Sequence, residues 1–224
     1  MKHNMLIQNI SLFRNIEATT MQLLLKKGRI VEVSKGTQLI REREPSGNLY
    51  FQLSGKSIVY NLTTNGKRKI LFVFGYGALL NGNLFNTRSS SNYCETIENS
   101  QLFVVSIQDF SKLMAMDFQL TRNLVEAQEH KMWRLSHQLK NTTSGISMEK
   151  KLVFKLKKLA RDFGVETEKG VEIDMQLSIT FLADMLGAPR ETTSRICSSL
   201  VEKGLISIER KRVTITDKGM ALKH

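Results

Sequence analysis

The stretch LADMLGAPRETTSRICSSLVEKGLI, from Leu182 to Ile206, contains the pattern from which the rest of the chain can be interpreted. Gly187 separates two segments of helical periodicity, at a point suited to a left-handed turn residue. Pro189 follows, and we expect it at the first position of the second helix, where its missing N–H removes no hydrogen bond. The stretch therefore predicts two helices joined by a tight turn.

The second predicted helix has two chemically different faces. Its inward stripe follows the spacing i, i+3, i+4, i+7 and consists of Thr193, Ile196, Cys197 and Leu200. The opposite face carries Arg190, Glu191, Ser194, Arg195 and Ser198. Arginine can donate two hydrogen bonds to guanine and glutamate can accept one from cytosine N4, so this face suits the edges of base pairs. An ordinary solvated helix would show the same spacing, so the spacing alone leaves both interpretations open.

The segment PRETTSR, residues 189–195, resembles the recognition-helix signature of the Crp–Fnr family of bacterial transcription regulators, usually Ser-Arg-Glu-Thr-Val-Ser-Arg. Pro189 replaces the first serine of that signature and Thr193 replaces the valine. The resemblance implies that Arg190, Glu191 and Arg195 contact bases, with Ser194 as an additional contact. It also implies an α+β chain with an N-terminal β-barrel of the cyclic-nucleotide-binding type, a long dimerisation helix and a C-terminal winged helix-turn-helix.

The composition agrees with a nucleic-acid partner but does not locate the binding surface. The chain has 224 residues and a net charge of +12, which favours an acidic polymer. Residues 1–147 carry 18 basic and 10 acidic residues, a net of +8, and residues 148–224 carry 15 and 11, a net of +4. The excess is therefore not concentrated in the predicted DNA-binding part, and the charge supports this function only weakly.

Several classes of protein are disfavoured by the sequence. The two cysteines, Cys94 and Cys197, form neither a disulfide framework nor a metal-binding spacing, and they fit a reducing cytoplasm. No apolar run approaches the roughly 20 residues of a membrane helix, and the N-terminus lacks signal-peptide architecture. Catalytic motifs such as G-x-S-x-G, H-E-x-x-H and the P-loop are absent, so we expect no enzyme, no metal and no cofactor.

The first half of the chain changes from helical to strand-like periodicity near Ile30. Residues 6–27 alternate short apolar clusters with polar residues and predict short helices. Strands are predicted at 30–33, 39–40, 49–53, 57–62, 69–74, 93–97 and 101–106, with Thr64-Asn65-Gly66 as a hairpin turn. Many short strands with glycine turns predict a barrel or sandwich. Their order resembles the barrel of the same family.

The segment GYGALLNGNLF, residues 75–85, admits two interpretations. It resembles the start of a dinucleotide-binding fingerprint, but Leu80 stands where that motif needs its last glycine. In the family's cyclic-nucleotide cassette, residues 80–82 would correspond to Gly-Glu-Leu and residues 91–93 to Arg-Ser-Ala. The ribose-binding glutamate and the phosphate-binding arginine are then missing, although a shifted loop could bring in Arg88. We therefore expect an effector other than cyclic AMP, either uncharged or weakly acidic.

That effector is expected between the cassette and the long helix. The candidate lining residues are Asn81, Gly82, Asn83, Tyr93, Gln128 and Met132. Two alternatives stay open: a regulator of the same family without an effector, and one controlled by oxidation of Cys94 or Cys197.

Residues 110–140 predict one helix of about 30 residues with a seam of alternating three- and four-residue spacings. The seam residues are Met114, Phe118, Thr121, Val125, Gln128, Met132, Leu135 and Leu139. A sustained spacing of this kind favours a parallel homodimer over packing within one chain. The predicted organisation is an effector-sensing domain at 1–109, a dimerisation helix at 110–141, a hinge at 142–147 and a DNA-binding domain at 148–224.

The predicted DNA-binding domain begins with an amphipathic helix at 149–163 and a short strand at 171–175. Ser178 can cap the first helix of the helix-turn-helix and is a candidate DNA contact. After Leu205, the alternating segment SIERKRVTITD predicts a two-stranded wing, with Lys211 and Arg212 as candidate phosphate contacts. The expected partners are a palindromic double-stranded DNA site, a second copy of the chain, RNA polymerase and a small-molecule effector, with no membrane.

Overall fold

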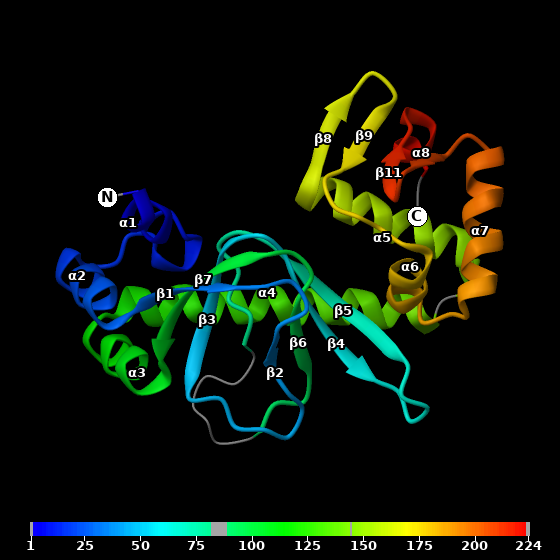
Figure 1. Cartoon of the computed structure of the whole chain (residues 1–224). Coiled ribbons are helices and arrows are strands. Elements are labelled where there is room, and N and C mark those ends of the chain that lie inside the picture. Colours follow the sequence, from blue (N-terminus) through cyan, green and yellow to red (C-terminus); the bar gives the residue numbers. More distant parts are fainter. Residues whose placement is uncertain (1, 82–88, 144, 223–224) are drawn as a thin grey trace. The chain divides into compact units, whose positions relative to one another are not determined.

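A computed structural model describes residues 2–81, 89–143 and 145–222 (Figure 1). The chain forms two compact units. One comprises Met1–Asn61 with Leu71–His137, and the other comprises Leu62–Ile70 with Gln138–His224. Among the described residues, no helix is both long enough and apolar enough to cross a membrane.

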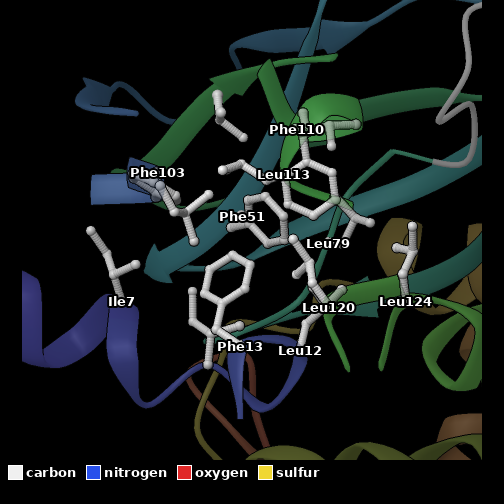
Figure 2. Close-up of a cluster of buried hydrophobic side chains, with 14 of the residues drawn as sticks. Ile7, Leu12, Phe13, Phe51, Leu79, Phe103, Phe110, Leu113, Leu120 and Leu124 are labelled. Atoms are coloured by element: carbon white, nitrogen blue, oxygen red, sulfur yellow. The ribbon is translucent and has the colours of Figure 1, made fainter. Parts of the chain in front are cut away.

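The first unit opens with short helices, as the alternation of apolar clusters predicts. They are α1 (Lys2–Gln8), the 3-10 helix η1 (Ser11–Phe13) and α2 (Ala18–Lys27). Their apolar side chains pack into a cluster that also receives side chains from the sheet and from the following helices (Figure 2). Phe13 lies 5.0 Å from Phe51 between ring centroids, and Phe51 lies 5.9 Å from Phe110. Burying these large rings fastens the N-terminal helices to the sheet.

Two antiparallel sheets follow, and they confirm the predicted all-β region. The strands are β1 (Arg29–Val33), β2 (Gln38–Ile40), β3 (Asn48–Ser54), β4 (Ser57–Leu62), β5 (Arg68–Phe74), β6 (Tyr93–Thr96) and β7 (Ser100–Ser106). One sheet has the order β1-β7-β3 and the other β2-β6-β4-β5. In the first, Phe51 of β3 lies opposite Phe103 of β7. The second sheet contributes Val59, Phe72, Phe74 and Cys94 to a separate buried cluster.

The predicted long helix is present, but it begins at Phe118 rather than near residue 110, because the chain breaks at Asp117. Helix α3 spans Ile107–Met116 and helix α4 spans Phe118–Thr143, while Asp117 is extended with φ −129°. Its Oδ1 accepts hydrogen bonds from Gln119 N at 2.9 Å and Leu120 N at 3.2 Å, and its Oδ2 accepts one from Glu17 N at 2.8 Å. An aspartate that binds nearby backbone N–H groups competes with helix continuation and caps a new helix instead.

The break also changes the predicted seam. Met114 belongs to α3 and packs against the aromatic cluster, and the Thr121 hydroxyl donates to the Met114 carbonyl at 2.8 Å. The remaining apolar members, Phe118, Val125, Met132, Leu135 and Leu139, are exposed on α4.

The second unit contains the helix-turn-helix beside a sheet. Its elements are α5 (Met148–Phe163), β8 (Gly164–Thr167), β9 (Gly170–Ile173), α6 (Ile179–Leu186), α7 (Arg190–Glu202), β10 (Ile206–Glu209), β11 (Arg212–Ile215) and α8 (Asp217–Ala221). The predicted wing is one hairpin of a four-stranded sheet with the order β10-β11-β9-β8. Strand β8 was not predicted, since its four residues are all exposed and show no alternation of apolar and polar side chains.

Candidate DNA-binding surface and ligand cavity

The turn between α6 and α7 has the geometry that Gly187 predicts. Gly187 has φ 72° and ψ 39°, a left-handed conformation that favours glycine, and its N–H donates to the Ala183 carbonyl at 2.7 Å. Ser178 Oγ accepts a hydrogen bond from Phe181 N at 3.1 Å, which confirms the predicted cap of α6. Pro189 lies one position earlier than expected, because it is the N-cap of α7 rather than its first residue.

Helix α7 has the two faces that its spacing predicts. Thr193, Ile196, Cys197 and Leu200 are buried. Arg190, Glu191, Ser194, Arg195 and Ser198 are exposed. The polar residues gather at the N-terminal end of the helix, which is the end that helix-turn-helix proteins place against base edges. Their contact with bases stays a prediction.

Glu149 connects the beginning of α5 to the C-terminal half of α7. Its Oε1 accepts a hydrogen bond from Ser199 Oγ at 2.8 Å, and its Oε2 forms an ion pair with Lys203 Nζ at 2.5 Å. The hydrogen bonds from Lys203 and Ser199 lower the pKa of Glu149. This contact joins α7 to α5. No sequence pattern predicts it, because Glu149 and Ser199 are 50 residues apart.

The basic residues of the wing differ in their exposure and in their ion pairs. Arg210 and Lys211 form the two-residue turn between β10 and β11, with φ 47° and 68°. Two consecutive positive φ values define the hairpin turn that Asn-Gly favours, so a pair of basic side chains here carries a conformational cost. Lys211 is exposed. Arg212, by contrast, forms an ion pair with Asp174 at 2.7 Å and lies 3.4 Å from Glu172.

The first unit contains a cavity of about 240 Å³ beside α4. Its walls come from strands β2, β4, β5 and β6, from residues 80–81 and 90–92, and from α4. The apolar lining consists of Ile40, Val59, Phe72, Phe74, Leu80, Cys94, Met132 and Leu135. The polar lining consists of Asn81, Ser90, Asn92, Tyr93, Gln128 and Lys131. Four of the predicted effector-binding residues therefore meet at this cavity, and Gly82 and Asn83 lie outside the described residues.

The polar residues that were predicted to bind the effector differ in the contacts they make within the protein. Asn81 is buried, its Oδ1 accepts from Tyr50 N at 2.8 Å, and its Nδ2 donates to the Asn48 carbonyl at 2.9 Å. Asn81 therefore fastens its segment to β3. Tyr93 stacks on Tyr60 with ring centroids 5.3 Å apart. Gln128 Nε2 is buried and has no hydrogen-bond partner among the described residues.

Lys131 was not predicted as a lining residue. Its ammonium donates to the carbonyls of Leu79 at 2.7 Å and Asn81 at 3.0 Å, and it lies 5.4 Å from the centroid of the Phe74 ring. Burial lowers the pKa of Lys131 to about 8. A signal was present in the sequence, because Lys131 follows Gln128 by three residues and so shares its face of the helix.

Comparisons with known proteins agree with this arrangement. Residues 151–220 match the family model of the Crp-like helix-turn-helix domain, and residues 30–117 match that of the cyclic nucleotide-binding domain. The chain is 29% identical to the probable transcriptional regulator flp of Lacticaseibacillus casei over 207 residues, which cover 92% of this chain and 91% of that protein. It is 25% identical to the global nitrogen regulator of Synechococcus elongatus, with 92% and 91% covered.

The chain belongs to the Crp/Fnr family of transcription regulators. A similar fold is seen in FixK2 from Bradyrhizobium japonicum, with a TM-score of 0.74 at 19% identity, covering 86% of this chain and 94% of that one. This Crp/Fnr chain is a DNA-binding regulator rather than an enzyme, and its mixed α and β architecture is the one predicted.

The cavity of this Crp/Fnr regulator differs from the cyclic-nucleotide site that the family's cassette would form. Asn81 stands where the resemblance implies the ribose-binding glutamate, and Ser91 stands where it implies the phosphate-binding arginine. No carboxylate and no guanidinium belongs to the lining that the structure describes. Arg88, which a shifted loop could bring in, lies outside the described residues.

Proposed function

We propose that this Crp/Fnr regulator binds a palindromic DNA site as a homodimer, and that a small organic effector other than cyclic AMP changes its affinity for DNA. In this proposal Arg190, Glu191 and Arg195 contact base edges and Ser194 makes an additional contact. Ser178 and the wing residues Lys211 and Arg212 contact the DNA backbone. RNA polymerase is the partner that would turn DNA binding into altered transcription.

The exposed apolar stripe of α4 supports a homodimer. Phe118, Val125, Met132 and Leu139 are spaced by seven residues and are 80%, 52%, 63% and 67% exposed. Seven-residue spacing of exposed apolar side chains is the pattern by which two parallel helices cover each other. Gln128, on the same helix, is a polar member of the predicted seam and one of the predicted effector-lining residues.

The observation that carries the effector proposal is that one helix contributes to both features. Gln128, Lys131, Met132 and Leu135 of α4 line the cavity, while Met132 is also a member of the apolar stripe and Leu135 is exposed on the same helix. A ligand in the cavity therefore contacts the element that would join two copies of the chain. Such a ligand can shift the equilibrium between two dimer arrangements if it binds one arrangement more tightly.

A regulator without an effector and a thiol-controlled regulator are the two alternatives. The cavity favours an effector, since its lining combines apolar side chains with a few polar groups, as ligand sites do. Both cysteines are buried, and burial raises the pKa of the Cys94 thiol to about 12 and raises that of Cys197. The reactive form of cysteine is the thiolate, so neither residue has the environment of a redox sensor.

The proposal is tested by selecting DNA from a randomised library with the full-length protein and then measuring binding by fluorescence anisotropy. We expect an inverted repeat whose half-sites lie about 34 Å apart on one face of the DNA. Sedimentation should show a dimer, free and DNA-bound. Selection of a single half-site by a monomer would refute the dimeric arrangement. Equal affinity for all library members would refute sequence-specific recognition.

A further inference from the structure

The cavity beside α4 contains a buried amide that lacks an acceptor. Gln128 lines the cavity, and its Nε2 is buried without a hydrogen-bond partner among the described residues. A buried donor left unpaired costs about 1–3 kcal/mol, so such groups are rarely retained without a use. The amide is therefore positioned to donate to an acceptor that comes from outside the chain.

A second donor lines the same cavity. Lys131 Nζ uses two of its three hydrogens on the carbonyls of Leu79 and Asn81. Within residues 2–81, 89–143 and 145–222, no carboxylate forms an ion pair with it. Lys131 is half-buried, and its positive charge meets two carbonyl oxygens and the Phe74 ring rather than a carboxylate. Because Gln128 and Lys131 are three residues apart on one helix, their donors face the same region.

The rest of the cavity is suited to a flat apolar body. The rings of Phe72 and Phe74 stack on each other, with centroids 5.4 Å apart and an angle of 17°. Val59, Leu80 and Met132 add aliphatic surface. The volume of about 240 Å³ lies below the roughly 300–1,000 Å³ of pockets for drug-sized ligands, so the occupant is small.

We propose that Lys131 and Gln128 hold the acidic group of a small organic monoanion whose apolar body lies against Phe72 and Phe74. This inference rests on the proposed function, since it names the ligand class for the same cavity. The Lys131 ammonium compensates one negative charge. The Arg134 guanidinium lies nearby, 4.9 Å from the centroid of the Phe72 ring, but it does not belong to the lining that the structure describes. A second charge on the ligand would therefore lack a partner in that lining.

The charges around Lys131 set the pH at which the anion binds. The groups that interact with its ammonium electrostatically are Cys94 of β6 and Arg134 of α4. Cys94 is an uncharged thiol at neutral pH, because burial raises its pKa to about 12. Lys131 has a pKa of about 8 without ligand, so it is largely charged at pH 7 and largely neutral at pH 9. A bound anion favours the charged form and should raise the pKa of Lys131.

The inference is tested by calorimetry on the full-length protein with small monocarboxylates, among them benzoate and phenylacetate, each paired with its carboxamide. The two members of a pair have the same shape and differ in charge. We expect at least one carboxylate to bind about tenfold or more tightly than its amide at pH 7, as a charge-assisted hydrogen bond would give. The difference should shrink at pH 9, where Lys131 is neutral.

Three variants separate a ligand contact from a structural role. Lys131→Met should remove the preference for the acid, and Lys131→Arg should retain it, because the guanidinium keeps the charge. Gln128→Glu should abolish acid binding, since its carboxylate would pair with Lys131 and occupy the site. Circular dichroism and ligand-free DNA binding show whether each variant is folded. The inference is overturned if no acid binds better than its amide, or if Lys131→Met keeps the preference.

The binding measurement does not involve DNA, so its failure is distinct from a failure of the proposed function. Acid binding without any effect on DNA affinity would leave the ligand site standing and remove its regulatory role. Sequence-specific DNA binding without acid binding would remove only the ligand class.

Discussion

Cys94 and Lys131 line the same cavity, and the positive charge of Lys131 acts on the thiol of Cys94. Burial raises the pKa of Cys94 to about 12, and the charge of Lys131 offsets this only in part. At pH 8 almost none of the Cys94 side chains is then a thiolate, the form that attacks disulfides and oxidants.

We therefore expect Cys94 to be inert in the folded protein. A colorimetric disulfide reagent at pH 8 should label Cys94 far more slowly in the native state than in guanidinium chloride. Cys197→Ser serves as the background in which Cys94 is the one remaining cysteine. Cys94→Ser and Cys197→Ser should both leave DNA binding under mild oxidant unchanged. Labelling at the same rate in both states would restore the thiol-controlled alternative.

The exposed face of α7 predicts a loss of specificity on substitution. Arg195→Ala should weaken binding to the selected site by about 1–3 kcal/mol and relax the preference at one base pair, because a bidentate arginine contact is removed. Lys211→Ala, in the wing, should instead weaken binding to all sequences alike and reduce its salt dependence. Anisotropy titrations on the selected site and its single-base variants distinguish the two. An equal loss on random DNA would make Arg195 a phosphate contact.

The apolar stripe of α4 predicts a dimer that one charge can disrupt. Val125 is exposed and does not belong to the cavity lining, so Val125→Glu should give monomers without affecting a ligand. Leu135→Glu should also give monomers, but Leu135 lines the cavity as well. His130→Glu is the matched control, since His130 is exposed and, at 3.6 residues per turn, lies far around the helix from Val125. Sedimentation equilibrium measures the oligomeric state of each variant. A dimeric Val125→Glu protein would show that the interface lies elsewhere.

We expect substitution of Asn81 to lower the stability of the protein rather than to remove a ligand contact. Asn81→Ala leaves the Tyr50 N–H and the Asn48 carbonyl without their partner, which should cost about 1–3 kcal/mol of unfolding free energy. Urea denaturation monitors this loss. Tyr93→Phe, at another polar position of the cavity wall, is the control, since it keeps the ring that stacks on Tyr60. A stable Asn81→Ala protein with altered ligand binding would instead make Asn81 an effector contact, as the sequence first indicated.

We expect the stability contributed by Asp117, between α3 and α4, to be lost in acid. Burial alone would raise its pKa, but hydrogen bonds from the Glu17 N–H, the Thr20 hydroxyl and the N–H groups of Leu120 and Gln119 lower it. A carboxylate with a lowered folded-state pKa stabilises the fold fully above its unfolded pKa of about 3.9 and loses that contribution as the pH falls through the folded value. Asp117→Asn should therefore be less stable than wild type at pH 7, and the gap should close in acid.

Amide hydrogen exchange at Glu17, Gln119 and Leu120 provides a local measurement of this effect, because these three N–H groups bond the carboxylate. Glu129→Gln, at an exposed position on α4, should change none of them. A gap between wild type and Asp117→Asn that stays constant with pH would show that charge has no part in the cap.

Local patterns in the sequence determined much of the DNA-binding part. The left-handed turn at Gly187, the cap at Ser178 and the buried stripe of α7 depend on neighbours within a few residues, so the spacing of apolar and capping residues is enough to predict them. The strands of the first unit followed from the same kind of local alternation. The exposed residues of α7 that are candidate base contacts could be named from the sequence because a helix that buries one face must expose the other.

Only the tertiary structure decided which polar groups are already bonded. The Asp117 carboxylate also accepts a hydrogen bond from the Glu17 N–H, 100 residues away, and the hydrogen bond between Glu149 and Ser199 spans 50 residues. Asn81 and Gln128 looked alike as polar lining candidates, yet packing bonds the amide of Asn81 to β3 and leaves that of Gln128 without an acceptor among the described residues. Local periodicity reports which face a residue occupies, whereas burial and hydrogen-bond partners depend on segments that meet only when the chain is folded.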